Sequence, residues 1–286
     1  MAHYDLIAAC WTSAGACRPR DADDRSPLSI RERVEAVSAA GFTGFGIRHQ
    51  DLLHVENTVG LGDFKRMLDD HGLTYAEVEF LEGWYLPPGP ERDIADKQRA
   101  DLLRGAEALG ALHIKAGGRF DGPRFEPDLI AEELRRLGQQ AADAGTRVGL
   151  EPMPFADIKT PQQGLDVVLK ADHSSAGLFV DVWHAGRAEV EFATLADLPV
   201  ERIFSVEMSD ADAEVRGSLI DDTFDERKFV GEGSLDIPGF IRAIKQTGYT
   251  GPWGVEMLST EFRGMPVTEA TKKSYDTLIK FLEADD

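Results

Sequence analysis

Short apolar runs alternate along the chain with longer stretches in which apolar residues recur at helical spacing. Eight apolar runs can be counted, and each gap between them is long enough for a crossover helix. Parallel strands need such a crossover, so the alternation predicts a parallel sheet covered by helices. The predicted strands are residues 4–10, 42–48, 73–81, 111–117, 146–152, 176–182, 202–208 and 251–257.

The segments between the predicted strands carry helix signals. In residues 128–144 the side chains of Ile130, Leu134, Leu137 and Ala141 form one apolar stripe at helical spacing. A glycine stands where a helix should end and the next strand begin in AAGFTG, DHGLTY, ALGALH, DAGTRV and QTGYTG. Five repeats of this junction support the same alternation of helix and strand.

Eight strand and helix units within 286 residues match the size of a (β/α)8 TIM barrel, with residues 1–286 forming a single domain. The chain is 42% hydrophobic and 29% charged, which is typical of a globular protein, and no linker-like segment divides it. An open doubly wound sheet is the alternative fold. It is less consistent with the sequence, because ACWTSAGAC follows the first strand where a G-x-G-x-x-G phosphate loop would be expected.

Composition narrows the class of protein. No run approaches the roughly 18 apolar residues of a membrane helix, and no basic region precedes an apolar segment at the start, so we expect a cytoplasmic protein without a membrane partner. Cys10 and Cys17 are too few for a disulfide framework. The formal net charge of −20 and the lack of a basic patch argue against binding nucleic acid.

Carboxylates end four consecutive predicted strands, the fifth to the eighth. The carboxyl ends of barrel strands meet at one mouth, where active sites of this fold are built. A single carboxylate there could simply cap the next helix, but four together would repel one another unless a cation were present. The pattern therefore predicts a divalent metal site. The four residues are Glu151, Asp181, Glu207 and Glu256.

The segments GLEPMP, FVDVWHAG and VGEGSLDIPGFIRAIKQTGYTGPWGVEM resemble the xylose isomerase-like TIM barrels. This family includes sugar phosphate isomerases and epimerases, ketose 3-epimerases, inosose dehydratases and, more remotely, endonuclease IV. The resemblance covers nearly the whole chain. It implies one Mn²⁺ ion, or Mg²⁺ or Co²⁺, bound by Glu151, Asp181, Glu207 and Glu256.

The third of these positions departs from the family pattern, because Glu207 stands where a histidine or glutamine is expected. As a ligand it would complete an all-oxygen shell, which favours Mn²⁺ or Mg²⁺ over Zn²⁺. Alternatively, Glu207 points away from the metal.

Substrate contacts are also implied by the resemblance and by position. His184 would contact substrate oxygens rather than the metal. The side chain of Lys115 could steer a substrate oxygen or pair with Glu151, and Trp11 and Trp84 could be packing residues. The long charged segment 210–229 is interpreted as a lid or a solvated loop. The predicted substrate-binding residues are His184, Trp11, His49, Glu79, Trp84, Lys115 and Arg216.

The resemblance predicts a sugar or sugar-derivative isomerase or epimerase that acts through an enediolate, with Glu151 and Glu256 as the proton-transfer bases. A lyase or dehydratase that eliminates a β-leaving group from a keto-sugar, keto-glycoside or keto-cyclitol is the alternative. A nuclease-like or non-catalytic protein is a third class. Zinc nucleases of the family use several histidines, whereas only His49 and His184 of the seven here lie near predicted strand ends. The expected partner is a small carbohydrate, and a homo-oligomer is left open.

Overall fold

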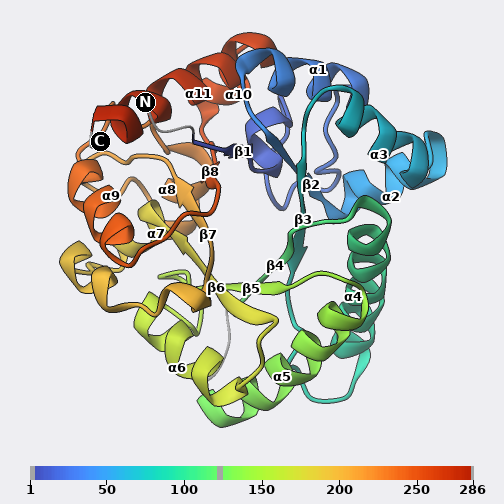
Figure 1. Ribbon diagram of the computed structural model, residues 1–286, viewed down its shortest axis with the longest axis vertical. Coiled ribbons are helices and arrows are strands. Elements are labelled where there is room, and N and C mark those ends of the chain that lie inside the picture. The colour runs from blue at the N-terminus through green and yellow to red at the C-terminus, as the bar shows by residue number, and fades with distance from the viewer. Residues whose placement is uncertain (1–3, 121–124, 285–286) are drawn as a thin grey trace.

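Eight parallel strands close into a barrel that is surrounded by helices (Figure 1). The structure is a computed structural model that describes residues 4–120 and 125–284. The strands are β1 (Leu6–Ala8), β2 (Gly44–Arg48), β3 (Tyr75–Leu81), β4 (His113–Gly117), β5 (Val148–Glu151), β6 (Ala176–Asp181), β7 (Ile203–Met208) and β8 (Trp253–Val255).

The helices fill the connections between the strands. The α-helices are α1 (Ile30–Ala40), α2 (His49–Thr58), α3 (Leu61–Asp70), α4 (Pro90–Leu109), α5 (Pro127–Asp143), α6 (Pro161–Ala171), α7 (Val182–Arg187), α8 (Leu219–Asp225), α9 (Ile237–Gln246), α10 (Thr260–Arg263) and α11 (Val267–Ala284). The short 3-10 helices are η1 (Cys10–Ser13), η2 (Phe192–Asp197) and η3 (Val200–Arg202). Among the described helices, none combines the length and the apolar character that crossing a membrane requires.

The predicted barrel is confirmed, and each strand lies inside the apolar run that predicted it. β1 pairs with β8 through Leu6 opposite Trp253 and Ala8 opposite Val255, which closes the sheet and excludes the open alternative. The apolar stripe predicted between residues 128 and 144 faces the core from α5, where Ile130 and Leu134 are buried.

The five junction glycines all adopt positive φ angles. Gly41, which follows α1, has a φ of 109°, and a Cβ atom there would lie 2.9 Å from the ring of Tyr275. Glycine reaches this backbone conformation without a steric penalty and leaves room for the ring. The junction motif therefore reflects both backbone geometry and close packing.

Polar residues occupy the inside of the barrel below its mouth. Glu77 on β3 and His113 on β4 are buried, and the carboxylate Oε1 lies 2.5 Å from the imidazole Nε2. Side chains two residues apart on a strand share a face, so Glu79 and Lys115 lie one level nearer the mouth on the same strands. The barrel therefore presents charged side chains at the carboxyl ends of its strands.

The charged segment 210–229 is more ordered than a solvated loop. It contains helix α8, whose first turn is capped by Ser218. The Asp225 carboxylate at the end of α8 accepts hydrogen bonds from the guanidinium groups of Arg18 and Arg263. These contacts connect the segment to the loop that contains Arg18 and to helix α10, which contains Arg263.

Candidate active site

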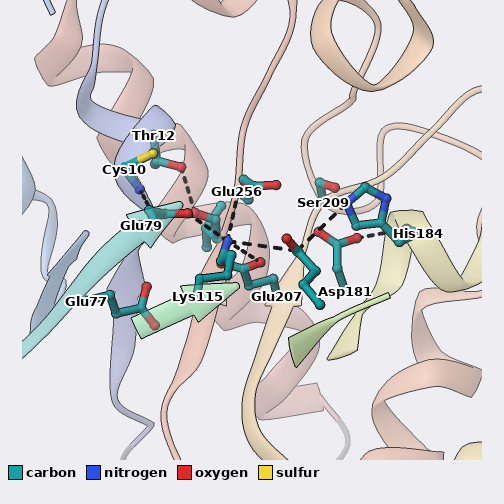
Figure 2. A network of polar contacts seen from close by, with 12 residues as sticks. Cys10, Thr12, Glu77, Glu79, Lys115, Asp181, His184, Glu207, Ser209 and Glu256 are labelled. Atoms are coloured by element: carbon teal, nitrogen blue, oxygen red, sulfur yellow. Dashed lines mark hydrogen bonds and ion pairs between the residues drawn. The ribbon is translucent and has the colours of Figure 1, made fainter. Parts of the chain in front are cut away.

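Four potential metal ligands meet at the mouth of the barrel. Glu151 ends β5, Asp181 ends β6, His184 lies in the first turn after it, and Glu256 directly follows β8. One ligand atom from each residue lies within 4.8 Å of those of the others, and all four residues are buried. Figure 2 shows Asp181, His184 and Glu256 around this point. We name these four residues the metal-ligand group.

Asp181 serves both local structure and the site. Its Oδ1 atom accepts a hydrogen bond of 2.9 Å from the backbone N–H of His184, which makes Asp181 the N-cap of α7. Its Oδ2 atom accepts a 2.9 Å hydrogen bond from Arg227. The helix-capping role and the place in the site are therefore not alternatives, because the cap fixes the direction in which the carboxylate points.

The structure places Glu207 against Lys115 rather than within the metal-ligand group. The Lys115 Nζ atom donates to both Glu207 carboxylate oxygens at 2.6 and 2.8 Å, and Glu207 is fully buried. Lys115 also lies 3.1 Å from Glu256 and 3.9 Å from Glu151. The expected Lys115–Glu151 pair is thus present, but at 3.9 Å it is longer than the Lys115 contacts with Glu207 and Glu256.

Arg227 contacts the metal-ligand group, although the sequence analysis did not single it out. Its guanidinium group donates to Asp181, lies 3.1 Å from the Glu256 carboxylate and lies 3.3 Å from His184 Nε2. Only 1% of the residue is exposed. It lies in a charged stretch, DERKF, where nothing in the sequence distinguishes it from its neighbours.

The buried charges shift the ionisation of the site. Burial raises the pKa of Glu151 to about 8 against the opposing charge of Lys115. Burial also raises the pKa of Glu256, but Lys115 and Arg227 outweigh it and lower that pKa overall. Burial and the Arg227 charge hold the pKa of His184 well below its usual range, so its imidazole is neutral. The two glutamates thus differ in proton affinity.

A cavity opens above the metal-ligand group, and Glu151, His184 and Glu256 lie in its lining. The Arg48 guanidinium stacks 4.3 Å from the ring of Trp11 at one side. Much of the remaining wall is apolar and aromatic. The other lining residues are Cys10, Pro19, Arg20, Asp24, Glu79, Phe80, Glu82, Phe120, Met153, Phe155, Thr223, Phe224, Arg227 and Leu258.

The predicted substrate-binding residues divide between this cavity and other places. Trp11, Glu79 and His184 lie in the cavity lining, and the Glu79 carboxylate accepts a hydrogen bond from the Cys10 N–H. Lys115 is 1% exposed and lies beneath the cavity floor.

Three of the predicted residues lie away from the described cavity lining. Trp84 is buried and donates from its indole N–H to the Gly117 carbonyl, which is a packing role. His49 pairs with Asp101 at 3.0 Å. The Arg216 side chain is 60% exposed and pairs with Asp212.

The metal-ligand group fits a divalent ion in its donor chemistry. Three carboxylates and one imidazole are common ligands of Mn²⁺, Co²⁺ and Zn²⁺. The Glu151 Oε1 atom is buried with no hydrogen-bond partner in the described chain, which leaves an acceptor for a cation. Because His184 brings a nitrogen to the group, the expected preference for Mn²⁺ or Mg²⁺ over Zn²⁺, which assumed only oxygen ligands, loses its basis.

Comparison with known proteins identifies relatives along most of the chain. Residues 34–284 match the sequence profile described as xylose isomerase-like TIM barrel. A 3-dehydroshikimate dehydratase of Pseudomonas aeruginosa is 31% identical over 250 residues, which cover 83% of this chain and 37% of that protein. The chain thus spans less than two-fifths of that relative's length.

Two further comparisons also find relatives among isomerases and proteins of the same fold. An inosose isomerase of Halalkalibacterium halodurans is 26% identical over 165 residues, which cover 54% of this chain and 57% of that protein. The solved structure of the IolI protein with a bound zinc atom superposes with a TM-score of 0.85 at 16% identity, covering 99% of each chain. The structural likeness at this low identity supports the shared fold.

Proposed function

Because this chain belongs to the xylose isomerase-like TIM barrel family, we propose that it is a metal-dependent dehydratase of a cyclic keto-polyol. One observation carries the proposal: the barrel mouth brings Glu151, Asp181, His184 and Glu256 together under a cavity that admits a small molecule. Relatives of the same family act on small ketone-bearing rings, by the names they carry.

The metal-ligand group would hold one divalent ion, and Mn²⁺, Zn²⁺, Co²⁺ and Mg²⁺ are the candidates. Such an ion supplies Lewis-acid polarisation of the substrate carbonyl and stabilises the negative charge that develops when the adjacent carbon loses its proton. The zinc atom of the IolI structure supports a metal in this fold, without fixing its identity here.

The chain's own residues would carry out the proton transfer. Glu151 ends β5, Glu256 directly follows β8, and both residues lie in the cavity lining. One of them takes the proton from the carbon beside the carbonyl. In an elimination the same carboxyl group returns this proton to the departing hydroxyl, so that water leaves and the carboxylate is restored.

Neighbouring residues would position the substrate and the bases. Arg227 holds Glu256 and Asp181 from one side. The charges of Lys115 and Arg227 together lower the pKa of Glu256, which keeps it ionised and able to accept a proton. In this proposal His184 is a metal ligand, in place of the substrate contact that the family resemblance implied. The aromatic wall that includes Phe155 and Trp11 suits the apolar face of a ring.

An isomerase or epimerase is the second candidate, favoured by the inosose isomerase relative. The sequence pattern alone ranked this outcome first. The longer and more identical match to a dehydratase reverses the order. In the isomerase reaction the second glutamate would deliver a proton to carbon, and no fragment would be lost.

The test is an assay of Mn²⁺-supplemented protein with 3-dehydroshikimate, inososes and free ketoses in deuterated water, followed by NMR. Loss of water from 3-dehydroshikimate or from an inosose supports the dehydratase. Deuterium incorporation without loss of a fragment supports the isomerase. Glu256→Gln should slow turnover by about two to four orders of magnitude. If none of the ketones exchanges deuterium or reacts, the proposed proton-transfer chemistry is wrong.

A further inference from the structure

Lys115 is a buried cation among four carboxylates, and the reaction proposed above assigns it no step. Its Nζ atom lies 2.6 Å from Glu207, 3.0 Å from Glu79, 3.1 Å from Glu256 and 3.9 Å from Glu151. Figure 2 shows the ammonium group at the centre of these contacts. Three strands and the segment after β8 thus converge on one side chain.

Lys115 does not reach the substrate cavity. Glu79 and Glu256 belong to the described cavity lining, whereas Lys115 and Glu207 do not. With 1% and 0% of their surfaces exposed, Lys115 and Glu207 lie directly beneath the floor. Lys115 can therefore influence the reaction only through the carboxylates that it contacts, which makes it a positioning residue.

Glu207 is occupied by this contact. Both of its carboxylate oxygens accept hydrogen bonds from Lys115, so neither is free of a cation. A histidine or glutamine at this position could not form a paired charge with a lysine. The glutamate at position 207, which departs from the family pattern, and the buried Lys115 therefore form one ion pair.

Glu256 is shared between Lys115 and the metal-ligand group. A divalent ion bound by Glu256 would have to share this carboxylate with the ammonium, and the two positive charges would repel each other in a poorly screened interior. In the absence of an ion, the same ammonium balances part of the negative charge of these buried carboxylates.

We propose that Lys115 is an internal counter-cation that sets the metal affinity of the site. It keeps Glu207 out of the metal shell, supports the fold when no ion is bound, and weakens the binding of a divalent ion by Glu151, Asp181, His184 and Glu256. This inference rests on the proposed metal dependence.

The test compares Mn²⁺ binding by the full-length parent and Lys115→Met, measured by isothermal titration calorimetry and by the electron paramagnetic resonance signal of free Mn²⁺. Methionine keeps much of the side-chain volume and removes the charge. We expect Lys115→Met to bind Mn²⁺ at least about tenfold more tightly. The metal-free variant should unfold at a lower temperature than the parent, and Mn²⁺ should raise that temperature by more. Lys170→Met, on the exposed face of α6, is the matched control and should bind like the parent.

A second pair of variants keeps the test open if Lys115→Met does not fold. Glu207→Gln and the double variant Lys115→Met/Glu207→Gln differ only at Lys115, and the double variant removes both charges of the pair. The double variant should again bind Mn²⁺ at least about tenfold more tightly than Glu207→Gln. Equal or weaker binding on removal of Lys115 overturns this inference alone, provided the parent binds Mn²⁺. If none of these proteins binds Mn²⁺, the inference falls together with the proposed metal dependence.

Discussion

The proton held by Glu151 allows a quantitative test of the site. The carboxyl group is buried, and burial, reinforced by the charges of Glu256 and Asp181, raises its pKa to about 8 against the effect of Lys115. A carboxyl group must lose its proton before it can bind a metal. Metal binding at neutral pH should therefore release a proton from Glu151.

The size of this release follows from the pKa. A group with a pKa of about 8 is roughly nine-tenths protonated at pH 7, half at pH 8 and one-tenth at pH 9. Mn²⁺ binding should thus release about 0.9 proton from Glu151 at pH 7 and about 0.1 at pH 9. Below pH 7 the apparent affinity should fall about tenfold for each pH unit through this group.

The assay is isothermal titration calorimetry with Mn²⁺ at pH 7 in two buffers that differ in ionisation enthalpy. The difference in heat gives the number of protons released. Glu151→Gln carries no ionisable proton and should remove this release from whatever binding remains. The exposed Glu107→Gln serves as the control and should behave as the parent. A parent that binds Mn²⁺ at pH 7 without releasing a proton would refute the reasoning, as would equal release by Glu151→Gln.

Four further outcomes can be measured on the same protein. In metal-free protein the raised pKa of Glu151 means that its contribution to the free energy of unfolding is greatest below about pH 4.5 and declines towards pH 8. The free energy of unfolding of Glu151→Gln, measured by urea denaturation, should therefore change less with pH over this range than that of the parent. Asp181→Asn should abolish Mn²⁺ binding in calorimetry. It should leave the far-ultraviolet circular dichroism spectrum unchanged, because asparagine can also cap α7. Undiminished Mn²⁺ binding would contradict the assignment of Asp181 as a metal ligand. Arg227→Met should destabilise the fold by about 3–5 kcal/mol, lowering the thermal midpoint by roughly 6–20 °C, because it leaves buried carboxylates without their partner. Arg216→Ala should leave kcat and KM unchanged within about twofold, and a large rise in KM would return this residue to the substrate site.

The fold could be predicted because its signals are local. Strand runs, helical stripes and junction glycines each depend on a few neighbouring residues, and all of them recur around the barrel. The strand-end carboxylates Glu151, Asp181 and Glu256 were also predictable, since the carboxyl ends of parallel strands must meet.

The pairing of charges across the mouth could not be predicted in this way. Lys115 and Glu207 lie 92 residues apart in the chain, and Arg227 lies 46 residues from Asp181. Whether a buried carboxylate turns to a lysine, an arginine or a metal depends on distances between side chains of different strands. Position along the sequence does not contain this information.

Because the barrel is closed, the arrangement of strand ends at its mouth does not depend on which strand comes first in the chain. β1 pairs with β8, and α11 packs against α1, so the first and last units are neighbours in space (Figure 1). The turn at Gly145, between α5 and β5, lies at the end of the barrel opposite the mouth. A circularly permuted protein, opened at this turn and joined by a linker between α11 and β1, should therefore retain the mouth intact.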